Sequence, residues 1–328
     1  MEVLKCQSAF TVVVFLLTLS PHTVSCLPEG CVQTGNDLAC PNLQSFPRPF
    51  ASDATSLNIY NANLKDIPAA AFRDMPNIEV ISISNTQIGT IKGCAFGAKT
   101  NMKTLTLYSC VIGTVESYAF CNITGQRESS MSLYLTTIKT IQPHAFSNVK
   151  GFNQLSIYSI NITSIESYAF DNLELRTSFS LYLANIDSIS AGAFQDIKSV
   201  ISIYSSNISA VGCYTFDKLH DYDHSFQLRS LRFNCDCSFA WLLKYLKSTP
   251  KFQTKDVTCF APASLQNSTF TNLTVEQLCP GSSPSMCDAS GVKPPVVTDI
   301  RCGTTVLAGS TTNMVCLMLL FIYKQELF

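Results

Sequence analysis

An aromatic pair recurs along this chain at a nearly constant interval, and this repeat constrains the fold more than any other feature of the sequence. An Ala-Phe or similar pair occurs seven times, with spacings of 24, 24, 26, 24, 24 and 22 residues between the phenylalanines. A period of this length is typical of proteins whose repeated units stack along one axis. The seven phenylalanines are Phe72, Phe96, Phe120, Phe146, Phe170, Phe194 and Phe216.

Each repeat also carries four apolar positions at fixed distances before its phenylalanine. Positions 15 and 13 residues earlier, such as Leu105 and Leu107, are apolar in all seven repeats. This alternation predicts a short strand with inward side chains. Positions 8 and 5 residues earlier, such as Ile112 and Val115, are also apolar, and we assign them to a turn after the strand. One repeat cannot bury this surface alone, whereas stacked repeats share a continuous core.

The repeat resembles the leucine-rich repeat family, whose strand reads L-x-x-L-x-L-x-x-N-x-L at about 20 to 29 residues per repeat. The resemblance covers roughly residues 54–233. It implies an α/β solenoid, a curved horseshoe with a parallel β-sheet on the concave face and a mostly irregular convex side. The family has an Asn at one position of each repeat, and this chain has other residues there in all seven repeats. The backbone groups that this Asn would hydrogen-bond therefore need other partners or water. The slot holds Ala62, Thr86, Cys110, Thr136, Ile160, Ala184 and Ser206.

Cysteine-rich segments flank the repeats and resemble the caps of extracellular members of this family. The C-terminal segment LRFNCDCSFAWLLKYLKS contains Trp241, which we expect to pack inside the cap. In the N-terminal segment, Cys31 and Cys40 precede the sequence PNLQSFP. The disulfide pairs expected from the resemblance are Cys31–Cys40, Cys235–Cys259 and Cys237–Cys279.

The total of 15 cysteines, without metal-ligand spacing, indicates an oxidising compartment. Cys94 and Cys121 lie near the phenylalanines of adjacent repeats and are candidates for a bridge. We expect buried free thiols at Cys110 and Cys213. The pairing outside the caps is otherwise open: Cys26 is lost with a signal peptide or left over, and Cys287 and Cys302 are candidates to close a stalk loop.

Both ends of the chain carry apolar runs that indicate targeting. Residues 9–19 follow Lys5 and precede small residues, the layout of a secretory signal peptide. In the tail, only residues 314–323 are strongly apolar, which fits a lipid-anchor signal, whereas the charges that follow favour a single-pass helix with Lys324 as its stop. We favour the lipid anchor over the single-pass helix. The expected layout is a signal peptide (1–26), an N-terminal cysteine cap (27–53), seven leucine-rich repeats (54–227), a C-terminal cysteine cap (228–281), a stalk (282–305) and a hydrophobic tail (306–328).

One column of the repeat is a candidate ligand-binding surface. The residue after the second inward position of each strand faces the concave side, because strand side chains alternate. This residue is Ser84 in one repeat and Tyr in the other six, beside a second column of small polar residues that includes Ser132 and Ser156. Tyr with Ser and Asn is typical of adaptable binding surfaces. The candidate ligand-binding residues are Tyr60, Tyr108, Tyr134, Tyr158, Tyr182 and Tyr204.

Five N-x-[ST] sequons predict N-glycosylation if the chain is secreted. Two of them, at Asn161 and Asn207, share one register just past the strand, so we expect a ligand to approach from the opposite rim or toward the N-terminal repeats. The five sites are Asn122, Asn161, Asn207, Asn267 and Asn272.

No catalytic constellation appears, and we expect neither enzyme activity nor a cofactor. The segment HDYDH (220–224) reads as a solvated loop, and no zinc spacing supports a metal there. With 22 basic and 23 acidic residues, the chain lacks the basic surface that nucleic acid requires. The predicted function is recognition or adhesion, with a protein or glycan ligand, on the extracellular side of the plasma membrane. The alternative is a structural matrix or surface-coat protein with no specific ligand. The oligomeric state and the ligand's identity are open.

Overall fold

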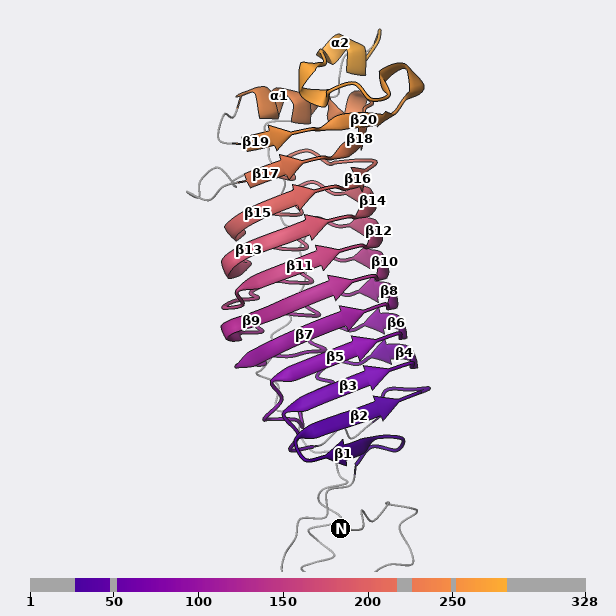
Figure 1. Ribbon diagram of the computed structural model, residues 1–328, viewed down its shortest axis with the longest axis vertical. Coiled ribbons are helices and arrows are strands. Elements are labelled where there is room, and N and C mark those ends of the chain that lie inside the picture. The colour runs from indigo at the N-terminus through magenta and orange to yellow at the C-terminus, as the bar shows by residue number, and fades with distance from the viewer. Residues whose placement is uncertain (1–26, 48–51, 217–225, 249–251, 282–328) are drawn as a thin grey trace, which may run out of the picture.

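A computed structural model describes residues 27–47, 52–216, 226–248 and 252–281. Within them the chain winds as stacked coils along one long axis, with the N-terminal cap at one end and the helical C-terminal cap at the other (Figure 1). Each repeat contributes one strand to each of two sheets, and strands of neighbouring repeats pair in parallel. The predicted solenoid is confirmed. The predicted signal peptide, stalk, tail and HDYDH segment lie outside the described residues, as do Cys26, Cys287 and Cys302.

Within the described residues, the first sheet has eleven strands and carries the tyrosine column. Its strands are parallel except for the antiparallel pair β1–β2 in the N-terminal cap. In order they are β1 (Val32–Thr34), β2 (Asp37–Pro41), β3 (Ser56–Tyr60), β5 (Val80–Ser84), β7 (Met102–Tyr108), β9 (Gly125–Tyr134), β11 (Gln154–Tyr158), β13 (Glu174–Tyr182), β15 (Lys198–Tyr204), β17 (Phe226–Arg229) and β19 (Phe252–Lys255).

A second sheet, with nine strands in the part of the chain that the structure describes, lies where the sequence predicted only a turn. The two inward residues of each strand, such as Ile112 and Val115, are three positions apart, because the middle residue of the strand is skipped when neighbouring strands pair. This spacing hides the strand from a search for strict alternation. Its strands are β4 (Asn63–Ile67), β6 (Gln87–Ile91), β8 (Val111–Val115), β10 (Thr137–Ile141), β12 (Asn161–Ile165), β14 (Asn185–Ile189), β16 (Asn207–Ile208), β18 (Arg232–Asn234) and β20 (Thr258–Ala261).

The seven repeat phenylalanines form a continuous aromatic column inside the solenoid. All are buried, and neighbouring ring centroids lie between 4.6 and 6.0 Å apart. The inward strand residues complete the core around them, as the repeat pattern predicted. The column holds the coils in one register, since each ring packs on the ring of the next repeat.

At three of the seven positions where the family has Asn, this chain has Thr or Ser, whose hydroxyl group makes hydrogen bonds to the backbone. Thr86 Oγ1 donates to the carbonyl of Ser84 at 2.8 Å and accepts from the backbone N–H of Ala62 at 3.3 Å. The expected alternative partners are therefore present at these slots. The equivalent bonds join Thr136 to Tyr134 O and Cys110 N, and Ser206 to Tyr204 O and Ala184 N.

Disulfides hold both caps. The structure contains the three pairs expected from the resemblance, Cys31–Cys40, Cys235–Cys259 and Cys237–Cys279. The C-terminal cap is built from the helices η2 (Cys237–Phe239), α1 (Ala240–Ser248), η3 (Ala263–Leu265), η4 (Phe270–Asn272) and α2 (Val275–Leu278). Trp241 of α1 is only partly buried and donates its indole N–H to the carbonyl of Val211 at 3.1 Å, so it joins the cap to the last repeat.

The remaining described cysteines differ in state. Cys110 is buried and free, as predicted, with its sulfur 3.4 Å from the carbonyl oxygen of Tyr108. Cys94 and Cys121 are disulfide-bonded. Cys213 is also disulfide-bonded, so the prediction of a free thiol there was wrong. A turn position, where Cys213 lies, leaves a thiol within reach of another chain segment, whereas the inward slot of Cys110 seals it in the core.

No helix in the described part of the chain is long and apolar enough to cross a membrane.

Candidate binding face

Five tyrosines form a parallel stack on the outer face of the first sheet. Each is the last residue of its strand, and the paired register places each one beside the next. The ring centroids are 4.6, 4.8, 4.9 and 4.8 Å apart, and the planes differ by 24°, 4°, 4° and 3°. This spacing equals the separation of neighbouring strands, about 4.8 Å. We call this set the tyrosine ladder; it consists of Tyr108, Tyr134, Tyr158, Tyr182 and Tyr204.

The sixth predicted tyrosine stands apart from the ladder. Tyr60 ends β3, and its register neighbours are Pro41 on one side and Ser84 on the other. The gap at Ser84 therefore separates Tyr60 from Tyr108 by one strand. All six tyrosines lie on one face of the sheet, and five of them are brought together.

A row of small polar residues runs parallel to the ladder, two positions earlier in each strand. Residues two apart in a strand project from the same face. Ser132, Ser156 and Ser180 are aligned in the register of β9, β11 and β13, next to Tyr134, Tyr158 and Tyr182. The tyrosine rings are half-buried, while Ser156 is 9% exposed. The face thus offers flat rings and hydroxyl groups in adjacent rows.

Two central tyrosines of the ladder resist ionisation. Burial raises the pKa of both Tyr158 and Tyr182 above the ordinary value, and the neighbouring tyrosines add to the rise because two phenolates would repel each other. Both phenols therefore stay protonated to a higher pH than a free tyrosine does, and each can donate as well as accept a hydrogen bond.

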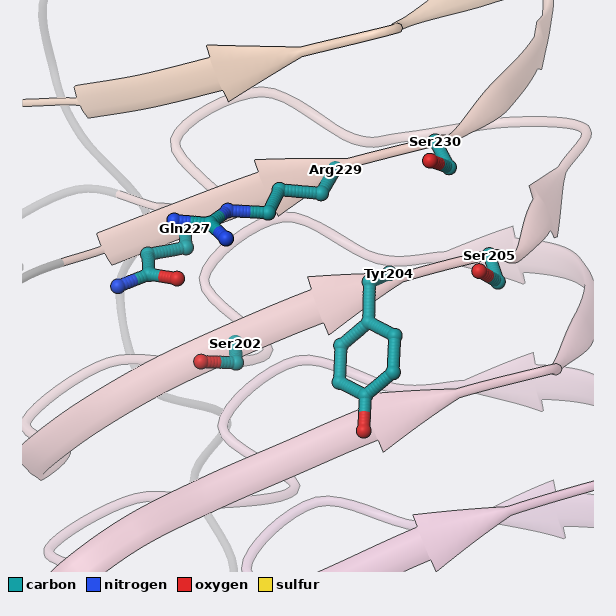
Figure 2. A pocket seen from close by; sticks show the side chains of 6 residues that line it. All are labelled: Ser202, Tyr204, Ser205, Gln227, Arg229 and Ser230. Atoms are coloured by element: carbon teal, nitrogen blue, oxygen red, sulfur yellow. The ribbon is translucent and has the colours of Figure 1, made fainter.

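A shallow hollow lies at the C-terminal end of the ladder, in the strands β15 and β17. It has a volume of about 310 Å³. Figure 2 shows the Tyr204 ring directed away from β17, and the Arg229 side chain running along its own strand toward Gln227. The residues that line it are Ser202, Tyr204, Ser205, Gln227, Arg229 and Ser230. Sequence reasoning missed this feature, because β17 breaks the Tyr pattern with Arg229.

The predicted glycosylation sites lie in three parts of the described structure: the turn after Phe120, the starts of two strands of the second sheet, and the C-terminal cap. Asn122, Asn161, Asn267 and Asn272 are exposed, and Asn207 is half-buried. Asn161 and Asn207 begin β12 and β16, across the turn from the ladder's edge. Asn185 links them: its amide N–H donates to Asn161 Oδ1 at 2.9 Å, and Asn207 donates to Asn185 Oδ1 at 2.7 Å.

Two exposed leucines at the edge of the ladder were not among the binding residues predicted from the sequence. Leu135 and Leu183 directly follow ladder tyrosines, and each is 54% exposed. Their φ angles are 51° and 52°, in the left-handed region that Asn61 and Asn85 occupy in equivalent repeats. The sequence does contain a sign of them, because they are apolar at a position where the other repeats have Asn or Ser. They add apolar area beside the tyrosine rings.

The described residues contain no cluster of three His, Cys, Asp or Glu that could hold a metal. His144 is buried between the rings of Tyr118 and Tyr168, with centroids 5.3 and 5.8 Å away, and its Nδ1 lies 3.0 Å from Asp171 Oδ2. This histidine is one layer of an internal stack.

Two solved structures are similar to this chain at low sequence identity. The chain is similar to human 5T4 (Wnt-activated inhibitory factor 1, trophoblast glycoprotein), at 16% identity over 79% of this chain and 100% of that chain, with a TM-score of 0.39. A second similarity is to an octameric complex of latrophilin 3, Unc5D and FLRT2, at 16% identity over 76% of this chain and 98% of that chain, with a TM-score of 0.28. Similarities this low carry no argument about function.

No curated protein matches the chain in a sequence search. The family model described as "BspA type Leucine rich repeat region" matches in six copies, over residues 50–131 and 114–235. These segments include all seven phenylalanine repeats and end at the first cysteine of the C-terminal cap. The chain belongs to the BspA-type leucine-rich repeat family.

Proposed function

We propose that this chain is a secreted or cell-surface recognition protein that binds a protein or glycan ligand on the tyrosine ladder. One observation carries the proposal: five half-buried rings are held nearly parallel beside a row of hydroxyl groups. Tyrosine gives a large contact area with only two rotatable side-chain bonds, so little conformational entropy is lost on binding. The neighbouring serines supply hydrogen bonds that adapt to the ligand.

The competing function is a structural matrix or surface-coat protein with no specific ligand. In that case the ladder acts only within the sheet, where aromatic cross-strand pairs contribute about 0.2–1 kcal/mol each. The exposed leucines beside the ladder favour binding. Leu135 and Leu183 occupy a left-handed backbone position that Asn, present in two other repeats, adopts with less strain, and they gain little burial in return.

The extracellular setting of the proposal is supported by chemistry. Disulfides such as Cys235–Cys259 form and persist in oxidising compartments. The signal peptide at 1–26, the two caps, the stalk and a lipid anchor in the 306–328 tail complete the proposed layout. Treating cells that carry the full chain with a phosphatidylinositol-specific phospholipase tests the anchor. Release into the medium is expected, and retention would favour a single-pass helix.

The binding experiment compares three forms of the full chain for saturable binding to cells or extracellular matrix. The test variant replaces Tyr134, Tyr158 and Tyr182 with Ala, and the matched control replaces Tyr60, which lies on the same face outside the ladder. We expect the triple variant to lose saturable binding and the control to keep it. Unchanged binding of the triple variant refutes the ladder as the site. If the unmodified chain shows no saturable binding, the structural function is favoured.

We further propose that glycans on Asn161 and Asn207 direct a ligand toward the opposite rim or the N-terminal repeats. Both residues lie at the turn just beyond the ladder, so sugars there crowd that approach. Intact-mass analysis before and after deglycosylation tests occupancy at all five sequons. Crosslinked contacts that cluster beside Asn161 and Asn207 on the glycosylated protein would contradict this direction.

A further inference from the structure

The tyrosine ladder ends abruptly at β15, although its sheet continues. Tyr204 packs against Tyr182 with a centroid separation of 4.8 Å and an angle of 3°. On its other side, the register partner of Tyr204 is Arg229 of β17. The position that would follow Tyr204 in the ladder therefore holds no aromatic ring. β17 still lies one strand spacing from β15, and that spacing sets the separation of the rings.

The side chain of Arg229 leaves this place open. Figure 2 shows it extended along β17 toward Gln227, so the guanidinium group does not cover the ring of Tyr204. The result is the hollow of about 310 Å³ between the two strands. A further planar ring at the ladder's own spacing would lie parallel to Tyr204 inside this hollow.

The polar groups around the hollow favour a negatively charged partner. An exposed guanidinium, an amide and the hydroxyls of Ser202, Ser205 and Ser230 line it, and among the residues that the structure describes no acidic one does. On the next strand, Lys255 is the register partner of Arg229 and is also exposed. Asp256 follows Lys255 but does not line the hollow. Two adjacent cations thus stand beside an open ring position.

We propose that this hollow is a subsite for an aromatic side chain of a protein ligand that is flanked by an acidic residue. The inference rests on the proposed function, since it names what one end of the binding face recognises. The aromatic ring continues the ladder beyond Tyr204. The neighbouring carboxylate accepts two parallel N–H bonds from the guanidinium of Arg229, a geometry that arginine provides and lysine does not.

A protein ligand fits this combination better than a glycan. The ladder rings are flat and parallel to within 4° over the last four tyrosines, so a flat ring continues them with the same offset packing. Sugar rings are puckered and match that packing less closely. A glycan that bears a carboxylate would make the contact with Arg229 but would lack the aromatic ring. Tighter binding of such a glycan is therefore the competing outcome of the test.

The test titrates the full chain with defined probes and follows binding by ligand-observed NMR. The probes are three acetylated and amidated peptides, Gly-Glu-Tyr-Glu-Gly, Gly-Lys-Tyr-Lys-Gly and Gly-Glu-Leu-Glu-Gly, and the carboxylated sugar sialyllactose. We expect the first peptide to bind at least tenfold more tightly than the others, because it alone combines the ring with the carboxylates. Equal binding of the basic or leucine peptide, or tighter binding of sialyllactose, overturns the proposal.

Variants locate the binding. Arg229→Gln should weaken the first peptide at least tenfold, and Tyr204→Phe should preserve its binding because the ring remains. The matched control is Arg232→Gln, an exposed arginine at the start of β18 in the other sheet. Peptide binding that is unaffected by Arg229→Gln, or equally weakened by Arg232→Gln, refutes the subsite. These titrations need no natural partner, so their failure is distinguishable from loss of saturable binding in the tyrosine triple variant.

Discussion

Truncation of a central core phenylalanine provides the sharpest test of how this solenoid is held together. Phe146 is 0% exposed and packs between two rings of neighbouring repeats. Its centroid lies 4.6 Å from that of Phe120, at 10°, and 4.8 Å from that of Phe170, at 18°. Phe146→Ala removes both ring pairs and leaves a cavity in the middle of the column.

The magnitude follows from burial. A fully buried Phe→Ala change costs about 3–5 kcal/mol of unfolding free energy, including the cavity that it leaves. Tyr158→Ala is the matched comparison, since Tyr158 also packs between two rings, 4.8 and 4.9 Å away. Its ring is half-buried and on the sheet surface, so its two cross-strand pairs contribute about 0.4–2 kcal/mol together. The two substitutions should therefore differ by about 1 kcal/mol or more.

The assay is urea denaturation of the full chain with its disulfides intact, combined with amide hydrogen exchange. In a stacked array each repeat contacts only its neighbours, so the faster exchange caused by Phe146→Ala should concentrate in the coils of Phe120, Phe146 and Phe170. Equal destabilisation by Phe146→Ala and Tyr158→Ala would refute the division between a stabilising inner column and an outer ladder that is available for binding. Uniform acceleration of exchange along the whole chain would refute the local coupling.

Three other substitutions test features of the coil. Thr136→Val removes the acceptor of the buried Cys110 N–H and should cost about 1–3 kcal/mol by denaturation, whereas an unchanged midpoint would contradict the hydrogen bond's role. Leu183→Asn relieves a φ of 52° at an exposed position and should stabilise the chain by up to about 1 kcal/mol, so a lower midpoint would contradict the strain. Burial raises the pKa of the Tyr158 and Tyr182 phenols above the unfolded value of about 10, so their contribution is complete below that pH and is lost as pH rises through the folded pKa. Replacing both with Phe should flatten the alkaline loss of stability, and an unaltered pH profile would exclude them as its source.

The sequence predicted the solenoid and its register because the repeat keeps almost constant length. A period of about 24 residues makes equal positions along the chain neighbours in space, so the column of Phe146 and the column of Tyr158 were both predictable. The second sheet was not predicted. Its inward residues, such as Ile138 and Ile141, are three apart, a spacing that period-two alternation does not detect.

The candidate site was predicted in part, and the missing parts depend on side-chain placement. The Tyr column and its interruption at Ser84 can be read from the sequence, because they require only the register. The open place beside Tyr204 depends on the direction that the Arg229 side chain takes, which no periodic pattern specifies. Likewise, the sequence does not show that Asn185 donates a hydrogen bond to Asn161 and accepts one from Asn207, because Asn185 is not part of a sequon.

The solenoid carries two aromatic columns with nearly the same ring spacing, and their surroundings separate their roles. Inside, the rings of Phe120 and Phe146 are 4.6 Å apart and fully shielded, so their packing contributes to stability. Outside, Tyr158 and Tyr182 are 4.9 Å apart and only half-buried, so part of each side chain stays available. Because the sheet fixes these rings before any ligand arrives, a ligand that contacts them loses little free energy to ordering the surface. That pre-organisation follows directly from the parallel register, and it is the physical reason to expect recognition on this face.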